Sequence, residues 1–472
     1  MKAYSMIING KNVGEDLSKI DVTNPSTGNV IATVPDGGAE EATQAVAAAY
    51  TAFEKWSDRT AYERSALLEK WYALINEHID ELAETMTVEQ GKPLHEARGE
   101  MNYANGFISW YAEQAKRIYG EMVPASHSNK RIFVHKQPVG VVAVITPWNF
   151  PAAMITRKVG PALAAGCTVV IKPAEQTPIT AIKLVKLAHE AGIPEGVINV
   201  VTGDAKAIGD AWLNDARVRK LTFTGSTEVG KLLMRGAAET VKKISLELGG
   251  HAPAIVMEDC DIDKAVEGVI AAKYRNAGQT CVCANRIYVH ESIVDAFSVK
   301  FIERVKQLQV GDGKQEGVHI GPLIDEAAVK KVQSHVDDAQ EKGANVAVGG
   351  SRKEGLFFEP TVLLNVTDDM ICMQEETFGP VTPITTFATE EEVLKRANDS
   401  IYGLAAYVFT ENLSKGIRMS EKLEYGIVGL NDGLPSTPQA PFGGFKQSGL
   451  GREGGHQGID EYIEVKYISV GL

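Results

Sequence analysis

The stretch VGVVAVITPWNFP, residues 139–151, is the first of four short runs rich in β-branched residues. Each run is followed by a stretch with helical apolar spacing, and the other three are CTVVIKP (167–173), GVINVVTG (196–203) and VRKLTFTGS (218–226). Strands that alternate with helices are typical of a parallel sheet covered by helices. The sequence therefore predicts an α/β fold with a doubly wound half over residues 139–245.

A second series of strand-like runs predicts another α/β unit over about residues 250–450. Its runs are APAIVME (252–258), RIYVHE (286–291), TVLLNV (361–366), TPITTF (382–387) and AAYVFT (405–410). Two segments lie outside both series, KRIFVHKQP (130–138) and YIEVKYISVGL (462–472). Both look like strands, suited to pair with each other or with another subunit.

The N-terminal third begins with turn-rich segments and continues with helices. IINGKNV (7–13) and NPSTGNVIATVP (24–35) are typical of hairpins. Residues 39–115 have helical apolar spacing, interrupted chiefly at Gly91–Pro93. We therefore expect a set of helices before the first parallel strand.

Composition excludes several classes of function. A formal charge of -13 over 472 residues argues against a nucleic-acid or anionic-membrane binder. The N-terminus lacks the apolar segment of a signal peptide, and no run of about 18 apolar residues occurs. We expect a cytoplasmic protein that binds neither nucleic acid nor membrane.

The five cysteines, at positions 167, 260, 281, 283 and 372, form no CxxC pair and accompany no histidine cluster. Neither a disulfide framework nor a metal site is expected from such a set, which fits a reducing compartment. In GQTCVCANR (278–286), however, Cys281 and Cys283 stand one residue apart. The spacing alone leaves open a metal half-site, a redox pair, or a nucleophile with a bystander.

Two loops after predicted strands are candidates for nucleotide binding. The amides of GSTEVG (225–230) can cradle a pyrophosphate at a helix N-terminus, although an ordinary glycine turn explains the motif equally. In KPAEQTP (172–178), Lys172 and Glu175 would face an adenosine ribose, because ligands bind at the carboxyl ends of strands in open sheets. The alternative for this second loop is a solvated surface turn.

Seven motifs together resemble the aldehyde dehydrogenase superfamily in order and spacing. They are PWNFP (147–151), KPAEQTP (172–178), FTGSTEVG (223–230), LELGG (246–250), GQTC (278–281), EETFGP (375–380) and PFGGFKQSGLGRE (441–453). The resemblance implies a modified Rossmann cofactor domain (1–115 and 139–248) and an α/β catalytic domain (249–447). It also implies a small β oligomerisation region (116–138 and 456–472), which would make the protein a homodimer or homotetramer.

The resemblance implies that Cys281 is the nucleophile. A thiolate attacks the aldehyde carbon, and the resulting thiohemiacetal loses hydride to the nicotinamide and becomes a thioester. Asn149 would stabilise the developing oxyanion together with the Cys281 amide. Glu247 would activate the water that hydrolyses the thioester. Pro151, the last residue of PWNFP, is expected to be the first residue of the following helix. The alternative role for Asn149 is a simple cap of that helix.

Further positions match cofactor-binding residues of the superfamily. Gly225 and Ser226 match the pyrophosphate loop. The remaining matches are Trp148, Lys172, Glu175, Glu376 and Phe378, which would surround the ribose groups and the nicotinamide. A carboxylate at Glu175 accepts hydrogen bonds from ribose hydroxyls and repels a 2′-phosphate, so NAD is expected, with NADP still possible.

A finer resemblance concerns the substrate. AMITRKVGPALAAGC (153–167) and RNAGQTCVC (275–283) look like the branch that oxidises succinate semialdehyde. Arg157 and Arg275, with Ser436, would hold the distal carboxylate of such a substrate. Taken singly, each arginine is as readily a structural ion-pair residue. The two prolines flanking Ser436 in LPSTPQAPFGG (434–444) depart from the branch pattern.

Several alternatives stay open. Glutarate semialdehyde is a competing substrate, because one methylene contributes only about 1–3 kcal/mol to discrimination. A broad-specificity aldehyde dehydrogenase, a cysteine hydrolase and a noncatalytic scaffold are further possibilities. Cys283 is either a small packing residue or a redox partner that forms a reversible disulfide with Cys281.

Overall fold

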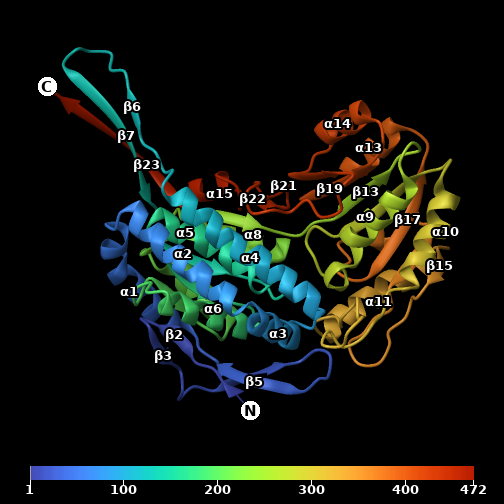
Figure 1. Cartoon of the computed structure of the whole chain (residues 1–472), viewed down its shortest axis with the longest axis horizontal. Coiled ribbons are helices and arrows are strands. Elements are labelled where there is room, and N and C mark those ends of the chain that lie inside the picture. Colours follow the sequence, from blue (N-terminus) through green and yellow to red (C-terminus); the bar gives the residue numbers. More distant parts are fainter. Residues whose placement is uncertain (1) are drawn as a thin grey trace.

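The computed structural model describes residues 2–472, which form two α/β units and a projecting β arm (Figure 1). The first unit is built on an eight-stranded sheet of order β22-β12-β11-β8-β9-β10-β2-β3. Its strands are β22 (Gly449–Leu450), β12 (Lys243–Glu247), β11 (Val218–Thr224), β8 (Val141–Ile145), β9 (Thr168–Lys172), β10 (Ile198–Val200), β2 (Met6–Ile8) and β3 (Lys11–Val13). The four strands predicted from the opening series are all present and mutually parallel.

Helices cover both faces of this sheet. The crossover helices are α5 (Ala153–Ala165), α6 (Pro178–Glu190), α7 (Ala205–Asn214) and α8 (Thr227–Ala238). The predicted N-terminal helices are confirmed as α1 (Ala39–Ser57), α2 (Ala61–Glu77), α3 (Ile79–Gln90) and α4 (Leu94–Ala115). α4 packs on α5 and α3 packs on α6, so α2, α3 and α4 form a second layer over these crossover helices, whereas α1 packs directly on β9 and β10 beside α7. The break between α3 and α4 falls at Gly91–Pro93, as predicted.

Two small structures join this unit. β2 and β3 form the first predicted hairpin and extend the large sheet through β10. The second hairpin joins β4 (Lys19–Thr23) to β5 (Val30–Pro35), and β1 (Lys2–Ala3) completes a separate three-stranded sheet.

The second unit is built on a seven-stranded sheet of order β15-β16-β17-β14-β13-β19-β20. Its strands are β15 (Asn345–Val348), β16 (Thr361–Leu364), β17 (Val381–Phe387), β14 (Ala284–His290), β13 (Ala252–Val256), β19 (Ala405–Phe409) and β20 (Ile427–Leu430). All five strands predicted for this unit are present. Its helices are α9 (Ile262–Tyr274), η1 (Arg275–Gly278), α10 (Val294–Val305), α11 (Glu326–Glu341), α12 (Ile371–Gln374), α13 (Glu390–Asn398) and α14 (Leu413–Lys422).

The chain returns to the first sheet after it leaves the second. β18 (Tyr402–Gly403) pairs with β21 (Phe445–Lys446), and β22 then pairs with β12 through Leu246↔Leu450. The short helix α15 (Gln457–Asp460) follows. Residues 448–455, which the predicted domain limits left unassigned, thus close the edge of the first sheet. We otherwise keep the predicted domain limits as a proposal.

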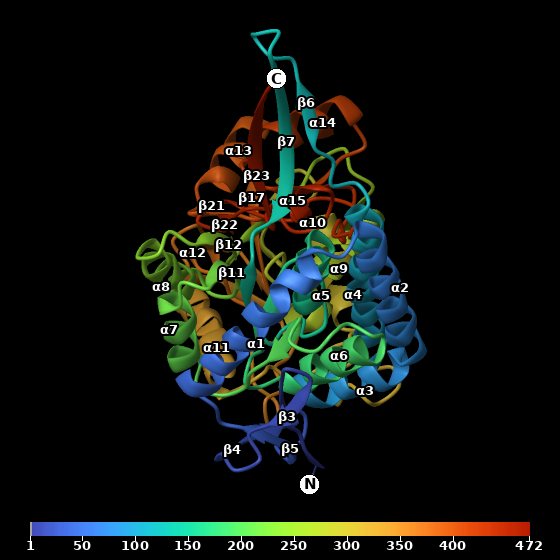
Figure 2. The same ribbon diagram turned by 90° about the vertical axis from the view of Figure 1, so that its left-hand side faces the viewer.

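The arm consists of β7 (Lys130–Pro138) between β6 (Glu121–Val123) and β23 (Ile463–Gly471). β7 and β23 pair antiparallel along their full lengths, from Pro138↔Ile463 to Lys130↔Gly471. Of the two arrangements open from the sequence, the structure shows the two segments paired with each other. Figure 1 shows the arm projecting away from both units, and in Figure 2 the loop between β6 and β7 forms its tip, with the C-terminus just below.

None of the described helices combines the length and the apolarity that a membrane crossing requires.

Candidate active site

Cys281 lies on the loop between η1 and β14, and a left-handed turn precedes it. Asn276 (φ 52°), Ala277 (φ 55°) and Gly278 (φ 75°) are consecutive residues with positive φ. A Cβ atom at Gly278 would lie 2.2 Å from the carbonyl oxygen of Gly379, so no other residue fits there. Non-glycine residues adopt this conformation only where their surroundings hold them in it. The path of the chain to Cys281 is therefore fixed by tertiary contacts.

Two cavities meet at Cys281. One has a volume of about 260 Å³ and lies beside the carboxyl ends of β8, β11 and β12. The other has a volume of about 340 Å³ and lies between α4, α5 and the Cys281 loop. Cys281 lines both cavities. We call them the nucleotide cavity and the substrate cavity because of the residues that the sequence predicted for each.

The nucleotide cavity contains five of the seven predicted cofactor residues. These are Trp148, Gly225, Ser226, Glu376 and Phe378. The Trp148 and Phe378 rings meet edge to face, with centroids 5.6 Å apart. The Gly250 amide donates to Glu376 at 3.0 Å, and burial raises the pKa of this carboxyl to about 7. This wall thus offers aromatic edges, a carboxyl group and a helix N-terminus.

Lys172 and Glu175 form an ion pair at the end of β9, and neither residue lines the nucleotide cavity. The Lys172 side chain is buried, whereas that of Glu175 is 38% exposed. The Glu175 charge is therefore partly neutralised by its neighbour. This weakens the electrostatic objection to a 2′-phosphate at the loop.

Asn149 is buried and lines the nucleotide cavity. Its Nδ2 donates to the carbonyl oxygen of Gln279 at 3.1 Å, which leaves the second amide hydrogen available to another acceptor. Its Oδ1 has no hydrogen-bond partner among residues 2–472. The side chain is thus oriented by the loop that carries Cys281.

The helix after PWNFP begins later than predicted. α5 starts at Ala153, so Pro151 is not its first residue. The amides of Ala152 and Ala153 donate to Glu100 of α4 at 3.0 Å and 3.2 Å. A buried carboxylate at a helix N-terminus accepts hydrogen bonds from otherwise free amides and interacts favourably with the helix dipole. Glu100, and not Asn149, therefore caps α5.

Glu247 ends β12 and is buried. Burial raises its pKa well above the ordinary value, and the nearby Glu453 carboxylate raises it further, whereas Arg157 and Lys158 oppose the shift. Its Oε2 atom has no hydrogen-bond partner among the described residues. Glu247 lines neither cavity in this structure, although its carboxylate is near enough to raise the pKa of the Cys281 thiol.

The three predicted substrate residues all line the substrate cavity with Cys281. Arg157 is buried, forms an ion pair with Glu453, and lies 4.4 Å from the centroid of the Phe442 ring. Its Nη2 has no hydrogen-bond partner within residues 2–472. Arg275 is half-buried and lies over the Phe150 ring, whereas Ser436 is half-buried on its loop. The charge of Arg157 is thus already paired with a carboxylate, whereas the charge of Arg275 lies over an aromatic ring.

Burial raises the pKa of the Cys281 thiol to about 12, although Arg157 and Arg275 lower it. Glu376 and Glu247 act in the same direction as burial. The thiol is therefore protonated at neutral pH in this arrangement. Nucleophilic attack requires a group that accepts its proton.

Cys283 is buried beside Lys273, with 3.4 Å between Sγ and Nζ. Its amide donates to the Thr280 carbonyl oxygen at 3.1 Å, so the chain turns between the two thiols. All five cysteines are free. The structure thus gives Cys283 a packing partner, while a disulfide with Cys281 stays a prediction.

Sequence reasoning missed several charged residues around the site. Lys92, Glu96, Glu100 and Lys331 line the two cavities, and Glu453 pairs with both Arg157 and Lys158. Glu453 lies in a quoted motif but received no role. Lys92 stands in the segment interpreted only as a break between helices, and the others have the spacing of ordinary helical surface residues. No signal in one sequence separates such residues from solvated charges.

A profile of the aldehyde dehydrogenase family matches residues 13–468. The mitochondrial succinate-semialdehyde dehydrogenase of Arabidopsis thaliana is 57% identical over 458 residues, which are 97% of this chain and 87% of the relative. The NADP(+) succinate-semialdehyde dehydrogenase of Escherichia coli is 55% identical over 472 residues (99% and 97%). A glutarate-semialdehyde dehydrogenase of Pseudomonas putida is 55% identical over 466 residues (98% and 97%).

Solved structures agree with these relatives. The crystal structure of an NADP-dependent enzyme of Escherichia coli superposes with a TM-score of 0.99 at 54% identity, covering 100% of this chain and 98% of that one. The paired α/β units thus have the aldehyde dehydrogenase fold. The chain belongs to the aldehyde dehydrogenase family, and it is an oxidoreductase.

Proposed function

We propose that this protein oxidises succinate semialdehyde to succinate with NAD or NADP, through a thioester on Cys281. The observation that carries the proposal is the position of Cys281 between the nucleotide cavity and a cavity lined by two arginines. A carbonyl carbon at this thiol would have the nicotinamide on one side and a cationic wall on the other. Both are needed to oxidise an aldehyde with an anionic tail.

The residues present fit a dinucleotide. The N-termini of α5 and α6 are occupied by the carboxylates of Glu100 and Glu89, whereas α8 is capped by its own Ser226 hydroxyl. Gly225 and Ser226 line the nucleotide cavity, so the N-terminus of α8 is the one suited to a pyrophosphate. When bound, the nicotinamide accepts the hydride. Trp148, Glu376 and Phe378 would orient its ribose and ring.

The thiol, the amide and the carboxyl would act in sequence. The Cys281 sulfur attacks the aldehyde carbon as its proton passes to a water molecule, and the carbonyl oxygen gains the electron pair of the broken π bond. The free N–H of Asn149 and the Cys281 amide would hold this oxyanion. The oxyanion then re-forms the carbonyl as the hydride departs, which leaves a thioester.

Glu247 would complete the cycle as a general base. It takes a proton from water, the resulting hydroxide attacks the thioester carbon, and the Cys281 sulfur leaves. A carboxyl group with a raised pKa suits this task because its carboxylate is a stronger base than an ordinary one. Because Glu247 lines neither cavity, we propose that its side chain turns toward Cys281 during this step.

The charges around the substrate cavity support a substrate with one negative charge. Three cations line the cavity against two carboxylates, namely Lys92, Arg157 and Arg275 against Glu96 and Glu100. Burial raises the pKa of Glu96 to about 7, which lowers the negative charge further. A distal carboxylate would balance the excess and pair with Arg275 and the free Nη2 of Arg157.

We propose NAD as a cofactor, with NADP also accepted. Glu175 suits the ribose hydroxyls of NAD. Its ion pair with Lys172 and its exposure would allow it to move aside, which would leave Lys172 to meet a 2′-phosphate. The NADP(+) relative of Escherichia coli supports this second use.

An initial-rate panel tests the proposal. It compares succinate semialdehyde, glutarate semialdehyde and the uncharged butanal, each with NAD and with NADP. We expect the highest kcat/KM with succinate semialdehyde and a much lower value with butanal, because butanal has no carboxylate. Equal kcat/KM values for the charged and uncharged aldehydes would refute carboxylate recognition.

Glutarate semialdehyde is the second candidate substrate, and the Pseudomonas putida relative favours it. It differs from succinate semialdehyde by one methylene, which contributes about 1–3 kcal/mol to discrimination. A kcat/KM for glutarate semialdehyde above that for succinate semialdehyde would reverse the assignment.

We also propose a homodimer or homotetramer that works in the cytoplasm. The arm exposes large apolar side chains, including Met122 (73% exposed), Val465 (67%) and Tyr467 (62%), which another subunit would cover. Five free cysteines suit a reducing compartment. Light scattering in solution tests the oligomeric state, and a monomer would refute this part of the proposal.

A further inference from the structure

We propose that the buried ion pair Lys92–Glu100 positions Asn149 for catalysis. The inference rests on the proposed role of Asn149 as oxyanion donor. Lys92 lies between α3 and α4, and Glu100 lies in the second turn of α4, so both belong to the outer helical layer. They are positioning residues, because they would act through Asn149.

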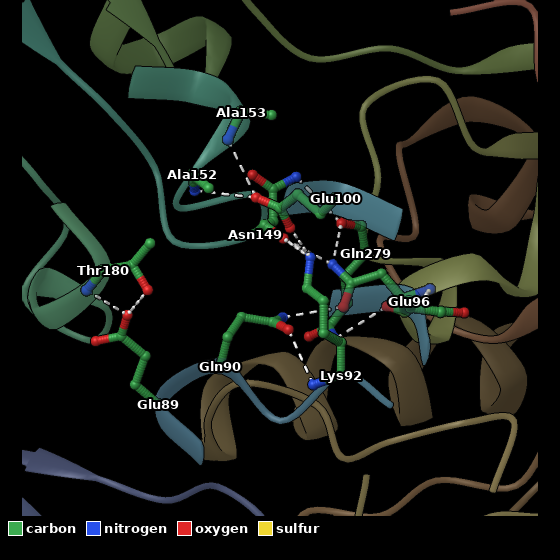
Figure 3. A network of polar contacts seen from close by, with 11 residues as sticks. Glu89, Gln90, Lys92, Glu96, Glu100, Asn149, Ala152, Ala153, Thr180 and Gln279 are labelled. Atoms are coloured by element: carbon green, nitrogen blue, oxygen red, sulfur yellow. Dashed lines mark hydrogen bonds and ion pairs between the residues drawn. The ribbon is translucent and has the colours of Figure 1, made fainter. Parts of the chain in front are cut away.

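The pair grips the segment around Asn149 at both ends. Lys92 Nζ donates to the main-chain oxygen of Asn149 at 2.8 Å and also bonds to Glu100. Glu100 accepts hydrogen bonds from the amides of Ala152 and Ala153, at the start of α5. Figure 3 shows Lys92 and Glu100 directed toward Asn149, Ala152 and Ala153. The path of the chain from Asn149 to α5 is therefore set by one lysine and one carboxylate.

The same layer also holds the loop that carries Cys281. Gln90 donates to Asn276 Oδ1 at 3.0 Å, and the Asn276 amide donates to Glu96 at 2.8 Å. Asn276 Nδ2 in turn donates to the Asn149 main-chain oxygen at 3.0 Å. The Asn149 main-chain oxygen accordingly accepts one hydrogen bond from Lys92 and one from Asn276. The two donors of the proposed oxyanion site are Asn149 Nδ2 and the Cys281 amide. The chain segments that carry them are thereby held by the same part of the outer helical layer.

Burial of the pair needs a reason other than stability. Both side chains are about 1% exposed. A buried ion pair gives little net stabilisation compared with apolar residues of the same volume, because each charge loses its hydration. It does, however, supply hydrogen bonds of fixed direction to three backbone groups. We conclude that the pair fixes the position of Asn149, and that its loss would displace Asn149 even in a folded protein.

The test separates geometry from stability by neutralising both partners. Lys92→Met alone leaves a buried carboxylate and can impair folding. The double variant Lys92→Met/Glu100→Gln removes both charges of the pair together, and the glutamine oxygen can still accept from the amides of Ala152 and Ala153. We expect it to fold with a Tm near that of the wild type. Its single-turnover rate of hydride transfer should nevertheless fall about tenfold or more, with an unchanged KM for the cofactor.

The decisive comparison repeats the double change in an Asn149→Ala background. If the pair acts through the Asn149 side chain, the change should there lower the rate less than about twofold, because coupled residues are not additive. An equal fractional loss in both backgrounds would overturn the inference and leave the oxyanion assignment intact. A wild-type rate in Asn149→Ala itself would overturn the oxyanion assignment, and this inference with it.

Glu89→Gln is a matched control. Glu89 is also buried in the outer helical layer and accepts the amides of Ile179 and Thr180 at the N-terminus of α6. It makes no contact with Asn149 among its hydrogen bonds. We expect this variant to change Tm and not the hydride-transfer rate. A tenfold loss of rate in Glu89→Gln would show that any disturbance of this layer slows the reaction, and would refute a specific role for the pair.

Discussion

The two cavities that meet at Cys281 are built in different ways. The nucleotide cavity is walled by strand ends, glycine turns and aromatic rings, and its charged side chains are Glu376 and Lys331. The substrate cavity is walled by helices α4 and α5 and carries five charged side chains, which are Lys92, Glu96, Glu100, Arg157 and Arg275. Changes at the cofactor residues of the first, Glu376 and Phe378 among them, should therefore act on cofactor binding, and the effect of changes in the second should depend on the charge of the aldehyde.

The largest expected effect removes the residue that both cavities share. Cys281→Ala should abolish aldehyde oxidation, by about 10⁴-fold or more, because no neighbouring side chain can replace the covalent step. The fold and NAD binding should persist, as circular dichroism and fluorescence titration would show. Substantial remaining turnover would point to Cys283 as the working thiol and would move the reaction out of both cavities.

Glu247→Gln should separate the two halves of the reaction. A rapid burst of NADH should remain, while steady turnover falls by about 10²–10⁴-fold, because hydride transfer precedes the water step. In the wild type, burial holds the pKa of Glu247 above its ordinary value, so the base form and the steady rate should increase as pH rises through that pKa. Stopped-flow absorbance across pH measures both phases. Equal loss of burst and turnover would instead place Glu247 in activation of the thiol.

Arg275→Ala tests the charged wall of the substrate cavity. The KM for succinate semialdehyde should rise about 30-fold or more, since loss of one partner of a desolvated charge pair costs about 2–5 kcal/mol. Butanal should lose only packing contacts, so its KM should change little. Parallel losses on both aldehydes, measured by initial rates, would make Arg275 a structural residue.

Arg157→Ala should show the same preference but with an additional loss of stability. Arg157 is buried and paired with Glu453, so its removal weakens the compensation of a buried carboxylate. The ratio of KM changes for charged and uncharged aldehydes is the informative quantity here, together with Tm. A normal ratio with a lowered Tm would assign Arg157 to the fold alone.

The smallest expected effect concerns Cys283. Peroxide should reversibly inactivate the wild type through a Cys281–Cys283 disulfide, in which the two thiols lose their hydrogens to peroxide. The turn between Thr280 and Cys283 should favour this disulfide, because the two cysteines lie closer together in a turn than in an extended chain. Dithiothreitol should restore activity, and mass spectrometry of a digest should detect the link. If the wild type and Cys283→Ala lose activity alike without recovery, the loss is overoxidation of Cys281.

Sequence reasoning reached further on the nucleotide side than on the substrate side. The parallel strands and their order along the chain followed from β-branched runs, because buried strands leave a local signal. Of the five predicted cofactor residues that line the nucleotide cavity, Gly225 and Ser226 also stood out as a glycine turn after a strand, whereas Trp148, Glu376 and Phe378 came from the resemblance to the family. The start of α5 was wrong by two residues, since a tertiary cap from Glu100 replaces the local one. Lys92 could not be found in advance. Its role depends on contact with Asn149, 57 residues away in the chain, which no local pattern encodes.

The central claim is that the reaction passes through a thioester where the two cavities meet, and trapping that thioester tests it most directly. Glu247→Gln is mixed with succinate semialdehyde and NAD, quenched in acid after the burst, and digested for mass spectrometry. We predict a succinyl group on the peptide that contains Cys281, attached to Cys281 and absent from the Cys281→Ala/Glu247→Gln variant. A burst of NADH without any acylated cysteine, or with the acyl group on Cys283, would contradict the account.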